Sequence, residues 1–464
     1  MTRTFNPYEY IGRHDAEVIR NIDVSSADRV HTVVEKVRAY LRDEHAQSFV
    51  KSIMEKKTRE QLKTAIADYI TIRGHLHIQG VELESLIKTV QQEILYYGPI
   101  QKALDDPRVT NIDINSPRDV YIEKDGEEIY APELGFKDAE HLDNIINKML
   151  IPLGKTLTAN DPHIDSLFEN FRICAVLHAQ RGGIATESTT VSIRKFAEDT
   201  LSPEQLVDGG AISAEMDQFF RDVVPHSNII IAGATNSGKT TTLVSFPLYF
   251  NENTRIITIE DSPEMMLRRK KAYRNYRNIV PLQTKHHENP EKRYDIAKLT
   301  KVSLRMRPWK IIVGEVRDGS AARQAHEAMN TGHNCYLTLH ASSARNAAIR
   351  IVQLAGDGYN DEAIAAQLAD TVDLILFQQK IKKSRIITEV AELIGYEGAK
   401  HPLCKIIFEY VQTGLTEDGR SEGYHRRINP ISAELAAKLK IGLVNLENIS
   451  RWRGISENEV TAIP

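Results

Sequence analysis

The chain has 464 residues, of which 41% are hydrophobic and 26% charged, and its formal net charge is −4. This length predicts two or three domains, and the acidic balance argues against a dedicated nucleic-acid-binding protein. Because the amino end is polar and no run approaches the ~18 apolar residues of a membrane span, we expect a soluble, cytoplasmic protein.

Residues 1–100 are predicted to form an amino-terminal helical region. Apolar residues recur at helical spacing in three stretches, 30–41, 62–72 and 83–95, and charged residues occupy the remaining faces. Residues 101–198 are predicted to form a small α/β domain. Its expected strands are 109–114, 120–124, 127–130, 172–177 and 190–195, with a helix at 139–150.

Residues 199–210 are predicted to be a linker, and residues 211–420 an α/β domain in which strands and helices alternate. The expected strands are 228–232, 255–259, 310–313, 334–339 and 373–378, and the expected helices are 239–248, 318–329, 344–354 and 361–370. Such repetition predicts a parallel sheet covered by helices. Residues 421–464 are interpreted as a helical carboxy-terminal tail.

A phosphate-loop pattern, G-x-x-x-x-G-K-[ST], stands at the start of this domain. A predicted strand precedes it and a predicted helix begins at Lys239, which is the context that the pattern requires. Glycines let backbone amides approach phosphate oxygens, Lys239 reaches the β- and γ-phosphates, and Thr240 offers a hydroxyl to Mg²⁺. A chance glycine-rich turn is the disfavoured alternative. The residues predicted to bind ATP or ADP are Gly233, Ala234, Thr235, Asn236, Ser237, Gly238, Lys239, Thr240 and Thr241.

Two carboxylates, Glu260 and Asp261, directly follow the expected strand 255–259. In this position they are expected to hold Mg²⁺, partly through water, with Thr240. The alternative is that Asp261 caps a helix before Pro263.

Two further strands end in polar residues. Glu315 follows the strand 310–313 and Gly314, and His340 follows the strand 334–339. Glu315 is predicted to orient or deprotonate the attacking water, although an acid at a strand end is often only solvated. His340 is predicted to contact or sense the γ-phosphate, with a purely structural histidine as the alternative.

These four segments occur in the order found in secretion ATPases of the type II and type IV secretion and type IV pilus systems, and the chain resembles that family. Residues 304–308, 312–317 and 328–333 are most similar to its CpaF-like, tight-adherence pilus branch. The resemblance implies a RecA-like ATPase domain, a homo-hexameric ring and a motor that hydrolyses ATP to drive an inner-membrane platform protein. It also implies a location at the inner face of the cell membrane.

The same resemblance implies that an arginine from the amino-terminal side completes the site, and Arg194 is the matching residue. Its alternative is a surface ion pair. The family's usual Arg-Leu-Pro-Asp-Gly segment is replaced here by 166–172, which leaves only Arg172.

The stretch 268–277 is strongly basic, with interleaved tyrosines. It is interpreted as a solvated loop or as a contact with anionic lipid, an acidic partner or nucleic acid, so peripheral membrane association stays open. Two other functions also stay open: a DNA-translocating ATPase of a conjugation system, and a nucleotide-gated scaffold without significant turnover.

Overall fold

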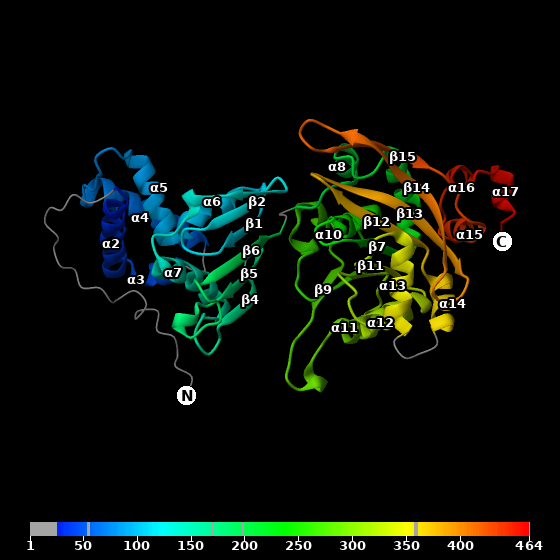
Figure 1. Cartoon of the computed structure of the whole chain (residues 1–464), viewed down its shortest axis with the longest axis horizontal. Coiled ribbons are helices and arrows are strands. Elements are labelled where there is room, and N and C mark those ends of the chain that lie inside the picture. Colours follow the sequence, from blue (N-terminus) through cyan, green and yellow to red (C-terminus); the bar gives the residue numbers. More distant parts are fainter. Residues whose placement is uncertain (1–25, 53–55, 169, 197–198, 357–360, 464) are drawn as a thin grey trace. The chain divides into compact units, whose positions relative to one another are not determined.

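The computed structural model describes residues 26–52, 56–168, 170–196, 199–356 and 361–463. The chain divides into two compact units, Met1–Ala197 and Glu198–Pro464 (Figure 1). None of the described helices is both long enough and apolar enough to cross a bilayer. The first 25 residues of the predicted helical region lie outside the described residues.

From residue 26 on, the described part of the amino-terminal unit starts with the helices α2 (Ser26–Glu44), α3 (Ala46–Ser52), α4 (Lys56–Asp68) and α5 (Leu83–Leu95). Apolar residues of α2, α4 and α5, such as Val37, Ile66 and Val90, share one hydrophobic cluster. This confirms that the helical spacing in the sequence marks a buried face.

An antiparallel six-stranded sheet follows, with the strand order β3-β2-β1-β6-β5-β4. Helix α7 (Ala139–Leu150) packs its apolar side, including Leu142 and Ile146, into the same cluster as the sheet residues Ile112 and Ile193. The strands are β1 (Val109–Ile114), β2 (Val120–Lys124), β3 (Glu127–Tyr130), β4 (His163–Phe168), β5 (Phe171–Val176) and β6 (Thr190–Lys195).

The carboxy-terminal unit is built on a nine-stranded sheet with the order β15-β14-β13-β12-β7-β11-β10-β8-β9. The six strands from β12 to β9 run parallel, and the other three continue the sheet antiparallel. The parallel strands are β7 (Ile229–Gly233), β8 (Ile256–Glu260), β9 (Ile279–Gln283), β10 (Lys310–Val313), β11 (Asn334–Leu339) and β12 (Leu374–Ile381). The antiparallel ones are β13 (Ser384–Tyr396), β14 (Pro402–Leu415) and β15 (Ser421–Arg427).

Helices cover both faces of this sheet (Figure 1). Along β7, Ile229 and Ile231 belong to one hydrophobic cluster and Ile230 and Ala232 to another, as expected for a strand buried on both sides. The first cluster includes residues of α9 (Ala214–Val223), α10 (Lys239–Ser245), α15 (Ala433–Ile441), α16 (Leu446–Arg453) and α17 (Glu457–Thr461). The second includes residues of α11 (Ile296–Ser303), α12 (Gly319–Asn330), α13 (Ala344–Gly356) and α14 (Asp361–Thr371).

The interpretation of 421–464 as a helical tail does not hold for its first residues. Residues Ser421–Arg427 form the edge strand β15, which pairs with β14 over seven residue pairs. Most side chains of this strand are exposed, and no residue of it is buried. Its sequence is therefore polar and lacks the alternation of apolar residues that would reveal a strand.

The rest of the tail is helical and anchors to α9. Trp452 is 2% exposed, donates from Nε1 to Asp222 Oδ2 at 2.7 Å, and lies edge-on to Phe219 with ring centroids 5.4 Å apart.

We therefore predict that Trp452→Ala lowers the stability of the carboxy-terminal unit by about 3–5 kcal/mol, since it leaves a large cavity. Urea unfolding followed by circular dichroism measures this loss. Ile441→Ala, at an 80% exposed position of α15, is the matched control, and an equal effect of both changes would contradict the anchoring role.

Candidate functional site

The phosphate loop joins β7 to α10 and is tightly enclosed. A Cβ atom on Gly233 would lie 2.2 Å from Gln378 O and 2.6 Å from Ser237 Oγ, and Gly238 has φ +96°. Both positions therefore require glycine. The first amides of α10, which an α-helix leaves without an intrahelical acceptor, begin at Lys239. A polyphosphate is the kind of ligand that such a loop and helix end accept.

Lys239 is folded over the loop that precedes it. Its Nζ donates to Gly233 O at 3.0 Å and to Ala234 O at 2.8 Å, and the residue is only 8% exposed. Burial lowers the pKa of Lys239, while the negative charge of Glu315 acts in the opposite direction. The ammonium group and Glu315 thus lie within electrostatic reach of each other.

Glu315 lies just beyond β10, between the side chains of His340 and Arg317. Its Oε1 is 2.9 Å from His340 Nε2, and its Oε2 accepts a hydrogen bond of 2.6 Å from Arg317 Nη2. Burial alone would raise the pKa of Glu315, but the hydrogen bond from Arg317 and the charges of Arg317, His340 and Lys239 lower it overall. The carboxylate is therefore ionised at neutral pH, as a group that accepts a proton must be.

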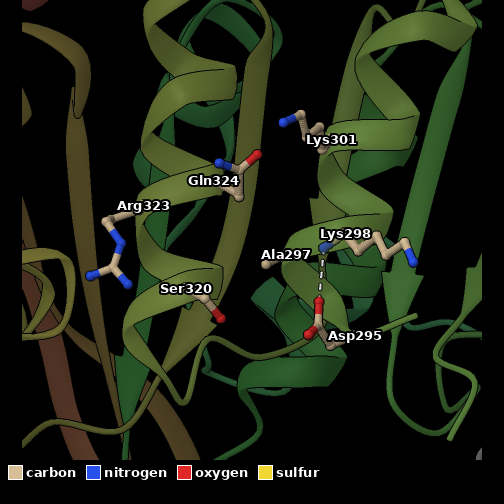
Figure 2. A pocket seen from close by; sticks show the side chains of 7 residues that line it. All are labelled: Asp295, Ala297, Lys298, Lys301, Ser320, Arg323 and Gln324. Carbon is tan, nitrogen blue, oxygen red and sulfur yellow. Dashed lines mark hydrogen bonds between the residues drawn. The ribbon is translucent and has the colours of Figure 1, made fainter. Parts of the chain in front are cut away.

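A cavity of about 390 Å³ opens beside this carboxylate. It is lined by Glu315, Val316, Arg317, Leu339, His340, Arg350 and Leu354. A second hollow, of about 350 Å³, lies between α11 and α12 (Figure 2). None of the predicted site residues lines this second hollow. Lys298 lines it, but its Nζ donates to Glu291 O and Arg293 O.

Glu260 ends β8 and is 5% exposed. Burial raises the pKa of Glu260 to about 8, although its Oε1 accepts a 2.8 Å hydrogen bond from Met265 N. A Cβ atom on Gly314 would lie 3.3 Å from Glu260 Cγ, so the glycine between β10 and Glu315 leaves room for the Glu260 side chain.

Asp261 is exposed, and residues 261–266 form a loop. The alternative of Asp261 as a helix cap is therefore wrong.

Beside the phosphate loop, the described side chains alone would not fill the coordination shell of a divalent cation, so a bound nucleotide would have to supply further ligands. Within the part of the chain that the structure describes, no three His, Cys, Asp or Glu side chains group to hold a metal ion. Mg²⁺ commonly takes one or two carboxylates and completes its shell with phosphate oxygens and water. The predicted metal ligands Thr240, Glu260 and Asp261 offer one hydroxyl and two carboxylates to such a shared site, and this assignment stays a prediction.

Arg194 belongs to the other unit. It is exposed on β6, where its register partner on β5 is Arg172. Arg172 is held by Asp165, to which its Nε donates at 2.7 Å. The predicted contact of Arg194 with phosphate stays a prediction.

The tyrosines of the basic stretch 268–277 are structural. Tyr273 donates to Val244 O and Tyr276 to Phe250 O, and both are buried. They are not available for stacking on bases, which removes the aromatic part of the nucleic-acid interpretation. The exposed cations of the stretch are Arg268, Arg269, Lys271, Arg274 and Arg277.

Sequence reasoning missed two residues beside the phosphate loop. Gln378 on β12 accepts a 2.8 Å hydrogen bond from Thr242 Oγ1, and Arg385 on β13 donates to Asn236. Gln378 follows the apolar run of β12, which is the same pattern of a polar residue near a strand end that identified Glu260, Glu315 and His340. Arg385 carries no such signal, because the pairing of β12 with β13 brings it to the loop.

A phosphate loop with an ionised carboxylate on a nearby strand of the same sheet defines a P-loop nucleotide-binding protein. The Type II/IV secretion system protein family matches residues 95–427, so the chain belongs to this family.

The chain is also similar to individual known proteins. An uncharacterized protein of Methanocaldococcus jannaschii is 25% identical over 69% of this chain and 56% of its own length. A putative conjugal transfer protein of Mycobacterium tuberculosis is 26% identical over 73% of this chain and 95% of its own length. Among solved structures, the ATPase DotB of Legionella pneumophila is 21% identical with a TM-score of 0.48, covering 79% of this chain and 85% of that chain.

We predict that the affinity for ADP with magnesium rises between about pH 7 and pH 9, because a carboxylate must lose its proton to bind a metal. The pKa of Glu260 is about 8, so its proton competes with the metal below this pH and has left above it. Calorimetric titration at both pH values measures the change. Glu260→Gln is the control and should remove the rise; the same rise in this variant would show that another group is responsible.

Proposed function

We propose that the chain is an ATP-hydrolysing motor of a secretion, pilus or conjugation system. The observation that carries the proposal is the position of Glu315, which is ionised, held by His340 and Arg317, and within electrostatic reach of the phosphate-loop Lys239. A protein that only binds nucleotide needs no such carboxylate, whereas hydrolysis needs a group that orients water and accepts its proton.

The loop 233–241 would bind the phosphates through its amides, and Lys239 would exchange its two carbonyl partners for β- and γ-phosphate oxygens. Glu315 Oε1 or Oε2 would accept the proton of the attacking water. His340, 2.9 Å from Glu315 Oε1, would orient that carboxylate and respond to the loss of the γ-phosphate. Mg²⁺, held by Thr240, Glu260 and Asp261, would neutralise charge on the phosphates.

The finer assignment is a CpaF-like motor of a tight-adherence pilus, acting as a homo-hexamer on an inner-membrane platform protein at the cytoplasmic face of the membrane. The family match over 95–427 supports the secretion role. In such a ring Arg194 would reach phosphate oxygens, a contact worth about 10³-fold or more in rate.

We predict that Glu315→Gln retains ATP binding and lowers the rate of hydrolysis by about 10²–10⁴-fold, as expected for loss of a general base. Lys239→Ala is the contrasting change and should weaken binding itself by about tenfold or more, since a charged hydrogen-bond donor is lost. Calorimetric affinity and phosphate release measure the two effects. If Glu315→Gln hydrolyses ATP at a rate close to that of the unchanged protein, another residue is the base. If the unchanged protein does not hydrolyse ATP, the nucleotide-gated scaffold is favoured.

A second candidate is a DNA-translocating ATPase of a conjugation system, because a relative with 95% of its length matched is a putative conjugal transfer protein. If that motor acts on DNA directly, single-stranded DNA should stimulate turnover severalfold. We expect no stimulation, because Tyr273 and Tyr276 are buried and the chain is acidic. Measuring hydrolysis with and without DNA, at low and high salt, decides between the two candidates.

A further inference from the structure

The β12–β13 hairpin projects to the phosphate loop and holds it with two side chains. Gln378, on β12, is buried and bonds to Thr242 of α10. Arg385, on β13, donates from Nε to Asn236 O at 3.3 Å and from Nη2 to Asn236 Oδ1 at 3.1 Å. A Cβ atom on Gly238 would lie 2.8 Å from Gln378 Nε2 and 3.2 Å from Arg385 Cδ. The hairpin therefore packs directly on the loop.

Asn236 is the loop residue whose backbone most needs support. Its φ is +62°, in the left-handed region that costs a residue with a side chain roughly 1–2 kcal/mol. Asparagine tolerates this region better than most residues. The Arg385 guanidinium bonds to both its main-chain and side-chain oxygens, and this fixes the residue in that conformation.

The bond to Asn236 O also sets the direction of the next amide. In a planar trans peptide the C=O of one residue and the N–H of the next point in opposite directions. Arg385 holds Asn236 O on the hairpin side, and the N–H of Ser237 points the opposite way, where it donates to Ala234 O at 3.4 Å. This amide is therefore used within the loop, and the two hydrogen bonds together hold the 236–237 peptide in one orientation.

The hairpin is itself anchored away from the loop. Its turn lies between the paired residues Ile381 and Ser384, and Ser384 Oγ accepts a 2.9 Å hydrogen bond from Ser421 N at the start of β15. Lys383 N also donates to Gly419 O at 3.4 Å. Arg385 thus acts from a fixed support rather than from a free loop.

We propose that Arg385 is a positioning residue that presets the phosphate loop for polyphosphate binding, an inference that rests on nucleotide binding at the proposed site. Its loss leaves Gln378 and both glycines in place, so the loop persists but samples other orientations of the 236–237 peptide. The expected result is weaker phosphate binding, with little change in the chemical step once the nucleotide is bound.

The test measures affinities for ADP and for pyrophosphate by calorimetry in the full chain, together with KM and kcat for ATP. Arg385→Ala should weaken both affinities and raise KM by about tenfold, with kcat changed less than about twofold, since two hydrogen bonds from a charged donor are lost. Arg385→Lys should recover only part of the affinity, because an ammonium does not reproduce the guanidinium fork. Arg426→Ala is the matched control. It removes an exposed arginine of β15 that pairs with Glu409 of β14.

Unchanged ADP and pyrophosphate affinities in Arg385→Ala would overturn the proposal. So would a loss confined to ADP, because the arginine would then contact the base or ribose and not act through the loop. Equal falls in thermal stability for Arg385→Ala and Arg426→Ala are expected, and a much larger fall in the former, with kcat lost, would make Arg385 a fold-stabilising residue instead. An unchanged protein that binds ADP without hydrolysing ATP would refute the motor, while the binding comparison would still decide the role of Arg385.

Discussion

The parallel register of the central strands is the constraint on which the site depends. Because β8, β10, β11, β7 and β12 run in one direction, their carboxyl ends lie along one edge of the sheet. Each strand brings a different group to that edge: the loop glycine Gly233, the acids Glu260 and Glu315, His340 and Gln378. A shift of one residue in any pairing would turn such a group to the other face of the sheet. The hydrogen bonds that set the register of the strands therefore determine which side chains meet at the carboxyl ends of these strands.

The polar groups at this edge are stabilised in different ways. Lys239 bonds to two carbonyls, Glu315 contacts His340 and Arg317, and Glu260 has one amide donor and a buried environment. As a result the pKa of Glu260 is raised and the pKa of Glu315 is lowered. Environments that push the pKa values of two carboxyl groups apart in this way favour different roles: Glu260 keeps its proton to a higher pH, whereas Glu315 is ionised at neutral pH.

The sequence predicted those parts of the site that local pattern determines. The phosphate loop, Glu260, Glu315 and His340 each follow an apolar run, and the rule that parallel strands end at one edge brings them together. The edge strands β9 and β15 were not predicted, since Pro281 interrupts one and the other is polar. Arg385 could not be assigned either, because its contact depends on the pairing of β12 with β13. The burial of Tyr273 and Tyr276 in the basic stretch could not be assigned for the same reason, because their hydrogen-bond partners are distant in sequence.

Strand β13 connects the loop to the rest of the unit through three side chains on one rigid element. Arg385 bonds to Asn236 in the phosphate loop, Glu389 Oε2 accepts from Ala344 N at the start of α13, and Glu392 Oε2 accepts from Ser432 N at the start of the tail helices. Helix α13 carries Arg350, which lines the cavity beside Glu315. Because a paired strand moves as a unit, a shift of the loop that displaced β13 would reach α13 and the tail together. These contacts join β13 to the phosphate loop, to the helix that lines the cavity beside Glu315, and to the tail.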